Sequence, residues 1–423
     1  MVKKIPRGGI KARRYRTIQG QEKDPKLTGK LTGKNEAMKS EYILIESEDA
    51  LIEVCNLLKG STWLAIDTEF EREKTFYPEL CLLQVANDNI VAIVDPLQID
   101  NLQPMFDLLY DSSITKVFHA ARQDLEIFCN LQKTIPAPLF DTQIAAPLLG
   151  YDEQMGYANL VNKMLGVELS KAHTRTDWKQ RPLQVAQLQY AADDVIYLGQ
   201  IYKLLVSKLE EHGRLDWLLD DFSVLLDIKL YEPDPDTVWR KIRAAKKLKG
   251  IKLCALQHLA AWREHKAREQ NRPRNWLMRD DVLVDLAQLQ PKNLSDLGRI
   301  KAMSEGMLNR HGEEILKIIE EAKQHEPMSL SKSQSRKALN IQEEAMVDAM
   351  MAIVRLTAFN KSLHPNILAS RKELEKFVCS DADSLLHKGW RQQLIGNDLA
   401  AFLRGEISFQ IEENEMVLIR KKN

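Results

Sequence analysis

The first half of the chain alternates between short apolar runs and segments whose apolar residues have helical spacing. Apolar runs bounded by turn residues predict strands, at residues 42–46, 62–70, 80–86, 90–96, 116–120 and the start of 138–150. Apolar residues three or four apart predict helices, at 49–59, 102–111, 122–131, 159–167 and 182–212. Three neighbouring strands followed by alternating helices and strands indicate an α/β domain with a mixed central sheet flanked by helices. We place this domain at residues 41–212.

Strand patterns nearly vanish in the second half of the chain. Residues 213–240 are helical and then broken by prolines, which predicts a connector. Helical patterns with Pro and Gly between them predict a first all-α unit over residues 241–325. A polar linker is expected at 326–343, and a second all-α unit at 344–423, ending in a short strand-like piece.

Charge is distributed unevenly although the formal net charge is zero. Residues 1–40 carry 12 basic and 3 acidic side chains, residues 41–200 carry 11 and 24, and residues 201–423 carry 37 and 33. The first segment lacks apolar periodicity and is predicted to be a disordered tail. Basic ends around an acidic middle favour nucleic-acid contacts outside the acidic part, although chance variation of solvated surfaces gives the same pattern.

The cysteines and the hydropathy exclude several classes of protein. The five cysteines are scattered and have no CxxC spacing, which argues against a disulfide framework and against structural zinc, and fits a reducing cytoplasm. No apolar run approaches the roughly 20 residues that span a bilayer, and the basic start has no apolar stretch behind it as a secretory signal would. We therefore expect a cytoplasmic protein without membrane contact.

Two carboxylates stand at the end of one predicted strand, in "WLAIDTEFERE". Asp67 and Glu69 are two residues apart, so they share one strand face. Their repulsion disfavours joint ionisation unless a cation lies between them, and Mg²⁺ favours such oxygen ligands. The alternative is a pair of solvated carboxylates on a fraying strand end.

Further acids appear in suitable positions along the chain. Asp124 lies in the first turn of the helix predicted after the strand in "KVFHAARQDLEIF". Tyr190 and Asp194 are four residues apart in "QLQYAADDVIYL" and share a helix face, whereas Asp193 points elsewhere. The ordered set is far more specific than any one of its members.

These motifs resemble the exonuclease motifs of the DEDD superfamily, in the branch with tyrosine in its third motif. "IDTEF", "FHAARQDLEIF" and "YAADDVIYL" match the three motifs, and "YPELCLLQVA", "LFDTQIAA" and "LSKAHTRTDWKQRPL" are similar to the ribonuclease D family. The all-α half resembles paired helicase-and-ribonuclease-D C-terminal (HRDC) domains. The resemblance covers about residues 42–423, is weaker for the second all-α unit, and does not include residues 1–40.

The resemblance implies a 3′→5′ exoribonuclease that uses two Mg²⁺ or Mn²⁺ ions. It implies that Asp67, Glu69 and Asp194 hold one ion and that Asp67 bridges to a second ion, which Asp124 orients. Two such ions can activate water and stabilise the leaving 3′-oxygen. Free tyrosine titrates near pH 10, so Tyr190 is expected to position the attacking water and not to act as a base.

Five residues are weaker candidates for contact with the substrate. Phe70 could stack on the terminal base, and a role in the core is equally open. His119 is expected to be structural or close to the substrate. Asp141 is expected to cap the helix that follows it. Three basic residues before the last helix of the domain could bind phosphate or pair with nearby acids: Lys171, Arg175 and Arg181.

The all-α half carries basic residues interleaved with aromatic ones near Trp262 and Trp276. This pattern fits nucleic-acid binding, and a solvated helix face with tryptophan in the core fits it equally. We expect a monomer whose helical units hold structured RNA, such as tRNA precursors, while the unpaired 3′ end is hydrolysed to nucleoside 5′-monophosphates. The alternatives are a 3′→5′ DNA exonuclease and a non-catalytic RNA-binding scaffold.

Overall fold

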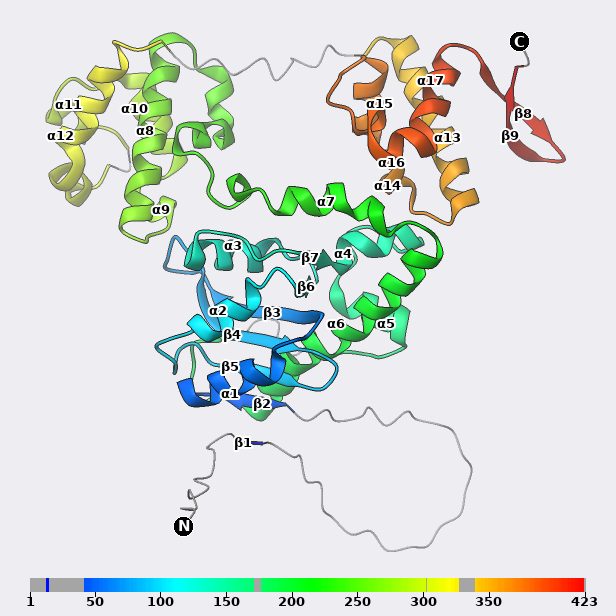
Figure 1. The fold of residues 1–423 in the computed structure, drawn as a ribbon. Coiled ribbons are helices and arrows are strands. Elements are labelled where there is room, and N and C mark those ends of the chain that lie inside the picture. The colour runs from blue at the N-terminus through cyan, green and yellow to red at the C-terminus, as the bar shows by residue number, and fades with distance from the viewer. Residues whose placement is uncertain (1–12, 15–41, 171–175, 302, 327–338, 422–423) are drawn as a thin grey trace, which may run out of the picture.

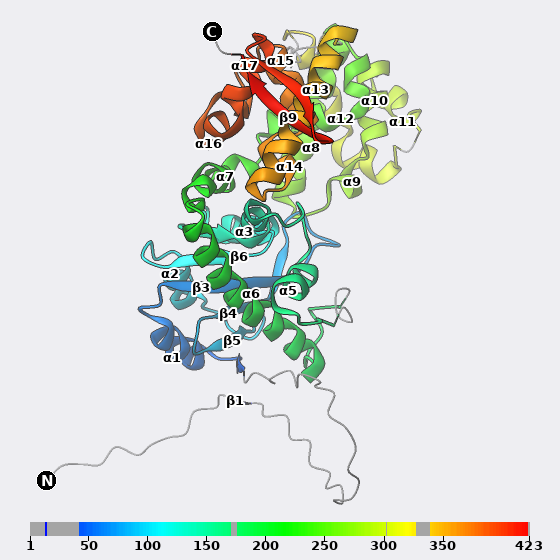
Figure 2. The same cartoon turned by 90° about the vertical axis from the view of Figure 1, so that its right-hand side faces the viewer.

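The computed structural model describes residues 13–14, 42–170, 176–301, 303–326 and 339–421. An α/β domain forms the lower part of the molecule in Figure 1, and two helical units lie above it on the same side. Figure 2 shows the same arrangement after a quarter turn. The predicted fold class is confirmed: a mixed sheet flanked by helices precedes a helical half.

The sheet of the α/β domain has seven strands in the order β1-β2-β5-β4-β3-β6-β7. β4 is antiparallel to both β3 and β5, and the pairs β2–β5, β3–β6 and β6–β7 are parallel, so the sheet is mixed. The strands are β1 Arg13–Arg14, β2 Ile43–Ile45, β3 Trp63–Glu71, β4 Glu79–Ala86, β5 Val91–Val94, β6 Thr115–Phe118 and β7 Leu139–Asp141.

The short strand β1 comes from the tail that the sequence predicts to be disordered. It pairs antiparallel with β2, so the prediction is wrong for these two residues. The rest of residues 1–40 lies outside the described residues.

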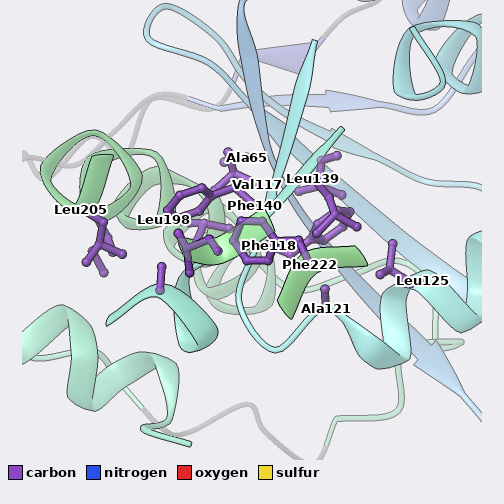
Figure 3. Packing of buried hydrophobic residues seen from close by; sticks show 14 of the residues in the cluster. Ala65, Val117, Phe118, Ala121, Leu125, Leu139, Phe140, Leu198, Leu205 and Phe222 are labelled. Carbon is purple, nitrogen blue, oxygen red and sulfur yellow. The ribbon is translucent and has the colours of Figure 1, made fainter. Parts of the chain in front are cut away.

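One long helix lies across the sheet and carries two candidate site residues. α6 contacts β3, β4 and β5, and Figure 3 shows Leu198 and Leu205 of this helix beside the core residues Ala65, Val117 and Phe140. The helices of the domain are α1 Glu48–Leu58, α2 Gln103–Leu109, α3 Arg122–Gln132, α4 Thr142–Ala145, the 3-10 helix η1 Ala146–Leu149, α5 Tyr157–Leu165 and α6 Val185–Glu211.

Gly199 allows α6 to lie close against β3. A Cβ atom at this position would lie 2.6 Å from Cη2 and 2.8 Å from Cζ3 of Trp63, the first residue of β3. Such distances are far below van der Waals contact, so a side chain here would separate helix and strand. The spacing between the two elements matters because each carries carboxylates of the candidate site.

Short helices connect the domain to the helical units. The connector contains η2 Leu215–Trp217, α7 Leu218–Leu225, η3 Ile228–Leu230, η4 Pro235–Lys241 and η5 Arg243–Lys247. The first helical unit consists of α8 Gly250–Glu269, α9 Arg274–Leu277, α10 Asp280–Leu289, α11 Leu294–Gly298 and α12 Glu305–Ala322. It has its own apolar core, to which η4 and η5 contribute.

The second helical unit ends in a β-hairpin, at the place where the sequence predicts a short strand-like piece. It contains α13 Ile341–Lys361, α14 Pro365–Leu368, α15 Arg371–Val378, η6 Leu385–His387, α16 Gly389–Arg391, the π-helix η7 Gln392–Gly396 and α17 Asn397–Leu403. The expected strand-like piece is a hairpin of two antiparallel strands, β8 Ile407–Glu412 and β9 Glu415–Arg420. None of the helices within the described ranges is both long and apolar enough to cross a bilayer.

We predict that replacing Gly199 with Ala destabilises the α/β domain. The clash with Trp63 outweighs the gain in helix propensity of about 1 kcal/mol, because overpacking costs roughly 1–3 kcal/mol. The net loss expected is about 1–2 kcal/mol in the free energy of unfolding, measured by chemical denaturation. Gln200→Ala on the exposed face of the same helix is the control and should be neutral. Equal or greater stability of Gly199→Ala would contradict the close approach.

Candidate active site

Asp67 and Glu69 lie in β3 and line a cavity together with residues of α6. The strand pairs regularly with β4 up to Glu69, and the register shifts between Glu69 and Phe70. The extra residue lies on β4, where Cys81 stands between the partners of Glu69 and Phe70. Four consecutive residues of β3, Asp67 to Phe70, line the same cavity, and Phe70 also packs against the main apolar core.

Asp194 comes to the two acids of β3 from α6. One oxygen atom from each of Asp67, Glu69 and Asp194 can be chosen so that all three lie within 4.8 Å of one another. Three carboxylates from two elements thus converge on one point, with Tyr190 one helical turn before Asp194.

Asp124 enters from the first turn of α3 and is only 7% exposed. The hydroxyl of Thr68, which stands between the two acids of β3, donates to its Oδ1 at 2.5 Å. The loop before α3 is held by Asp141, whose carboxylate accepts from the backbone N–H groups of Ala120 (3.1 Å) and Ala121 (2.8 Å). Ala120 has a φ of +59°, so these two bonds hold a backbone conformation that alanine seldom adopts.

The predicted helix cap at Asp141 is confirmed. Its side chain also accepts from Gln143 N at the start of α4. One carboxylate therefore fixes both the entry to α3 and the start of α4.

A cavity of about 530 Å³ lies elsewhere in the molecule. The four acids line a different cavity, which measures about 470 Å³. Its size is typical of sites for small ligands, which span about 300–1,000 Å³. All five predicted catalytic residues line it, and so do Phe70 and His119. The five are Asp67, Glu69, Asp124, Tyr190 and Asp194.

The carboxylates of the cavity repel one another and are poorly solvated. Burial is the main cause that raises the pKa of Asp67 well above its usual range, followed by the charge of Asp194. Burial also raises the pKa of Glu69, with Asp67 adding to the effect. Asp124 and Asp194 have raised pKa values for the same main reason. Without a cation, the four groups cannot all ionise near neutral pH.

This donor set fits divalent metal ions. Among the described residues, no lysine or arginine forms an ion pair with any of the four acids, although surface acids elsewhere in the domain have such partners. Clustered oxygen donors without a cationic side chain are the environment that Mg²⁺ and Mn²⁺ prefer. The charge of such ions would reverse the repulsion that raises the four pKa values.

Tyr190 is held beside Asp194 and keeps its proton. Its hydroxyl is hydrogen-bonded to Asp194, and its ring lies 6.3 Å from that of Trp178. Burial, followed by the charges of Asp194 and Glu69, raises its pKa above the ordinary value of 10. A neutral phenol donates a hydrogen bond and cannot act as a base at neutral pH.

His119 forms part of the cavity wall, with both ring nitrogens engaged by the protein. Nε2 donates to the Met155 carbonyl at 3.0 Å, and Nδ1 lies 2.9 Å from Thr142 Oγ1. Burial lowers the pKa of His119, so the ring is neutral. Of the two roles expected for His119, structural or close to the substrate, these contacts favour the structural one.

Arg181 does not line the cavity, and of its two expected roles the structure shows the pairing with an acid. Its guanidinium pairs with the buried Asp95 through two bonds, 2.5 and 2.7 Å long. It also donates to the carbonyls of Cys81, Trp178 and Gln180. Every side of the group is thereby used to fix the segment before α6 to the sheet. Lys171 and Arg175 lie outside the described residues.

Two residues of the site gave no recognisable signal in the sequence. Thr68 was visible only as the spacer between two acids, and its hydroxyl anchors Asp124 from another element. Tyr157, at the start of α5, lines the cavity and donates to the Asp193 carbonyl at 3.0 Å. Its ring lies 5.5 Å from that of His119. Both contacts join residues far apart in the chain, so local patterns could not predict them.

Comparison with known sequences supports the exonuclease interpretation of this site. A family described as 3′–5′ exonuclease matches residues 42–210, and the HRDC domain family matches residues 253–319. The chain is 35% identical to ribonuclease D of Bartonella henselae over 95% of its own length and 98% of the relative. It is 37% identical to ribonuclease D of Gluconacetobacter diazotrophicus over 88% of this chain and 95% of the relative.

The fold also matches a solved structure over most of its length. The crystal structure of Escherichia coli RNase D, described as an exoribonuclease involved in structured RNA processing, superimposes with a TM-score of 0.71. The two chains are 32% identical, and the match covers 86% of this chain and 99% of the other.

We predict that divalent cations stabilise this protein through the acidic cluster. At ten times the dissociation constant, a bound ion stabilises the folded state by about 1.4 kcal/mol, a rise of roughly 3–5 °C in Tm for a domain of this size. Asp67→Asn should raise Tm without metal, because it removes a buried like charge, and should abolish the further rise with Mn²⁺ in a thermal-shift assay. Asp193→Asn, whose carboxylate bonds Gln189 instead, is the control that keeps the response. A full Mn²⁺ response in Asp67→Asn would refute the metal assignment.

Proposed function

The chain belongs to the ribonuclease D family of 3′→5′ exoribonucleases, and from this premise we propose how its site works and on which RNA. The proposal is that Asp67, Glu69, Asp124 and Asp194 hold two divalent ions, Mg²⁺ or Mn²⁺, at which the terminal phosphodiester is hydrolysed. It is supported above all by the convergence of three carboxylate oxygens within 4.8 Å in a cavity without a cationic side chain among the described residues.

The four acids divide into two groups by their surroundings. Asp67, Glu69 and Asp194 converge on one point and would share one ion, and the charge of Asp67 also acts on Asp124. Asp124 is held by Thr68 and lies outside the cluster of three, so it would serve the second ion. When bound, such ions lower the pKa of water and stabilise the charge that develops on the leaving oxygen.

The remaining groups of the cavity orient the reactants. The Tyr190 hydroxyl keeps its proton and donates a hydrogen bond to Asp194, and its oxygen accepts a hydrogen bond from the attacking water, which is thereby positioned beside Asp194. Phe70, which lines the cavity, offers a face on which the terminal base can stack. We propose that the 3′ end enters unpaired, since the cavity is lined by residues of β3, α3, α5 and α6 on several sides.

The substrates proposed are tRNA precursors and other structured RNAs with unpaired 3′ ends, trimmed to nucleoside 5′-monophosphates in the cytoplasm by a monomer. The helical half supports this proposal, since an HRDC domain beside an exonuclease site can hold the body of an RNA while its end is shortened. We propose the same HRDC-like role for the second helical unit, residues 344–423.

Incubation of the purified protein with end-labelled, 3′-extended tRNA tests this function. With Mg²⁺ we expect stepwise shortening from the 3′ end and release of nucleoside 5′-monophosphates, and without Mg²⁺ or in Asp67→Asn no shortening. An equal amount of unlabelled single-stranded DNA is the competitor. Preferential loss of the DNA would favour the alternative of a DNA exonuclease, and binding without any hydrolysis would favour the scaffold.

Replacing Tyr190 with Phe should lower kcat by roughly tenfold to a hundredfold, because loss of the hydroxyl leaves the attacking water poorly oriented. The Kd for RNA, measured in Ca²⁺ to prevent turnover, should stay within about twofold. Tyr197→Phe on the same helix is the matched control, since Tyr197 does not line the cavity. An unchanged kcat in Tyr190→Phe would remove this residue from the mechanism.

A further inference from the structure

The segment that follows the catalytic strand reaches out to the first helical unit. Residues 72–77 come directly after β3. Phe76 is only 8% exposed and packs with Ala267 and Leu277 of the helical unit in a small apolar cluster separate from the main cores. The chain that bears Asp67 and Glu69 is thus continuous with a contact between the two parts of the molecule.

One asparagine of the helical unit binds the backbone of this segment. Asn271 Oδ1 accepts from both Phe76 N and Tyr77 N, each at 3.0 Å. Asn271 follows α8 with a φ of +46°, a conformation that asparagine adopts more readily than most residues. Its position at the helix end therefore presents the side-chain oxygen to two adjacent N–H groups.

Two arginines of the helical unit surround the Phe76 ring. The guanidinium carbons of Arg274 and Arg268 lie 4.6 and 5.8 Å from the ring centroid, within the range of cation–π attraction. Both are held by Glu264, which has no exposed surface, and Arg268 also donates to the Pro233 carbonyl. The sequence pattern that suggested nucleic-acid binding by these two arginines is therefore explained by an internal contact.

The cavity of about 530 Å³ at this junction is lined by Lys241 and by arginines that carboxylates of the protein already engage. Three arginines line it, and each already has a carboxylate partner: Arg72 with Glu126, Arg263 with Asp280 and Arg274 with Glu264. A phosphate would have to displace these carboxylates. The charges of the junction hold the two parts together.

The same segment is tied to the catalytic elements on its other side. Arg72 pairs with Glu126 of α3, the helix that begins near Asp124, and its Nε donates to the Phe76 carbonyl at 3.0 Å. The cavity of the site shares Glu69 and Phe70 with a neighbouring cavity, which in turn shares Glu73 with the junction cavity. Residues 67–76 thus form one continuous wall from the acids to the helical unit.

We propose that residues 72–77, bound by Asn271, Arg268 and Arg274, determine specificity by fixing the first helical unit at a set position relative to the acids. An RNA whose body rests on the helical unit needs this fixed distance to place its 3′ end. A short oligonucleotide reaches the acids without it. This inference rests on the proposed function, and Asn271 acts in it as a positioning residue.

Three variants test the contact. Asn271→Gly keeps the backbone conformation and loses the acceptor, Asn271→Asp keeps both, and Phe76→Ala removes the apolar side of the contact. For Asn271→Gly and Phe76→Ala, we expect kcat/KM on 3′-extended tRNA to fall about tenfold, mainly through KM. On a single-stranded pentanucleotide, kcat/KM should stay within twofold, and Asn271→Asp should behave as wild type on both substrates.

Small-angle X-ray scattering gives a readout that is independent of activity. The radius of gyration should increase in Asn271→Gly and in Phe76→Ala and stay unchanged in Asn271→Asp. Equal losses on the two substrates, or no change in either kinetics or scattering, would overturn the proposal while wild-type trimming of tRNA leaves the proposed function standing. If wild type trims no RNA, the proposed function fails, whereas an increased radius in Asn271→Gly would still establish the contact.

Discussion

The repulsion among four poorly solvated carboxylates is the constraint on which the arrangement of the catalytic domain depends. Asp67, Glu69 and Asp194 would separate if side-chain freedom allowed it, and burial makes their ionised forms costly. The fold holds them together through rigid elements: a central strand, a 27-residue helix and the first turn of α3. A divalent ion bound among the carboxylates would offset this repulsion, so the arrangement favours metal binding.

The packing around the acids serves this purpose more than it serves general stability. Gly199 removes the side chain that would separate α6 from β3 at Trp63, and the domain gives up helix propensity at that position in return for the distance between the acids of the two elements. The Asp141 carboxylate accepts two backbone hydrogen bonds from the loop before α3, and these bonds stabilise the unusual backbone conformation at Ala120. In both places a local cost is accepted where it fixes a catalytic group.

The sequence was sufficient for the features that depend on local spacing, and insufficient for those that depend on partners far along the chain. Strand alternation placed Asp67 and Glu69 on one face, and the helical repeat paired Tyr190 with Asp194; both relations are properties of a single element. Phe70 lines the cavity and also packs against the main core, and the sequence could not decide between these two roles. Arg181 was a candidate RNA ligand because a sequence shows its charge without showing Asp95, which neutralises it from 86 residues away.

The two helical units are attached to the catalytic domain by contacts of different kinds, and this difference bears on how the enzyme can move. The second unit shares the main apolar core: Trp390 stacks on Trp217 at 4.5 Å, and Arg214 donates to the carbonyls of both Leu148 and Lys361. The first unit has its own core and meets the domain through one phenylalanine, one asparagine and charged groups. Small polar interfaces open more readily than apolar ones of larger area. The position of the first unit therefore depends on a few contacts, and the segment that makes them is the direct continuation of the strand that carries the acids.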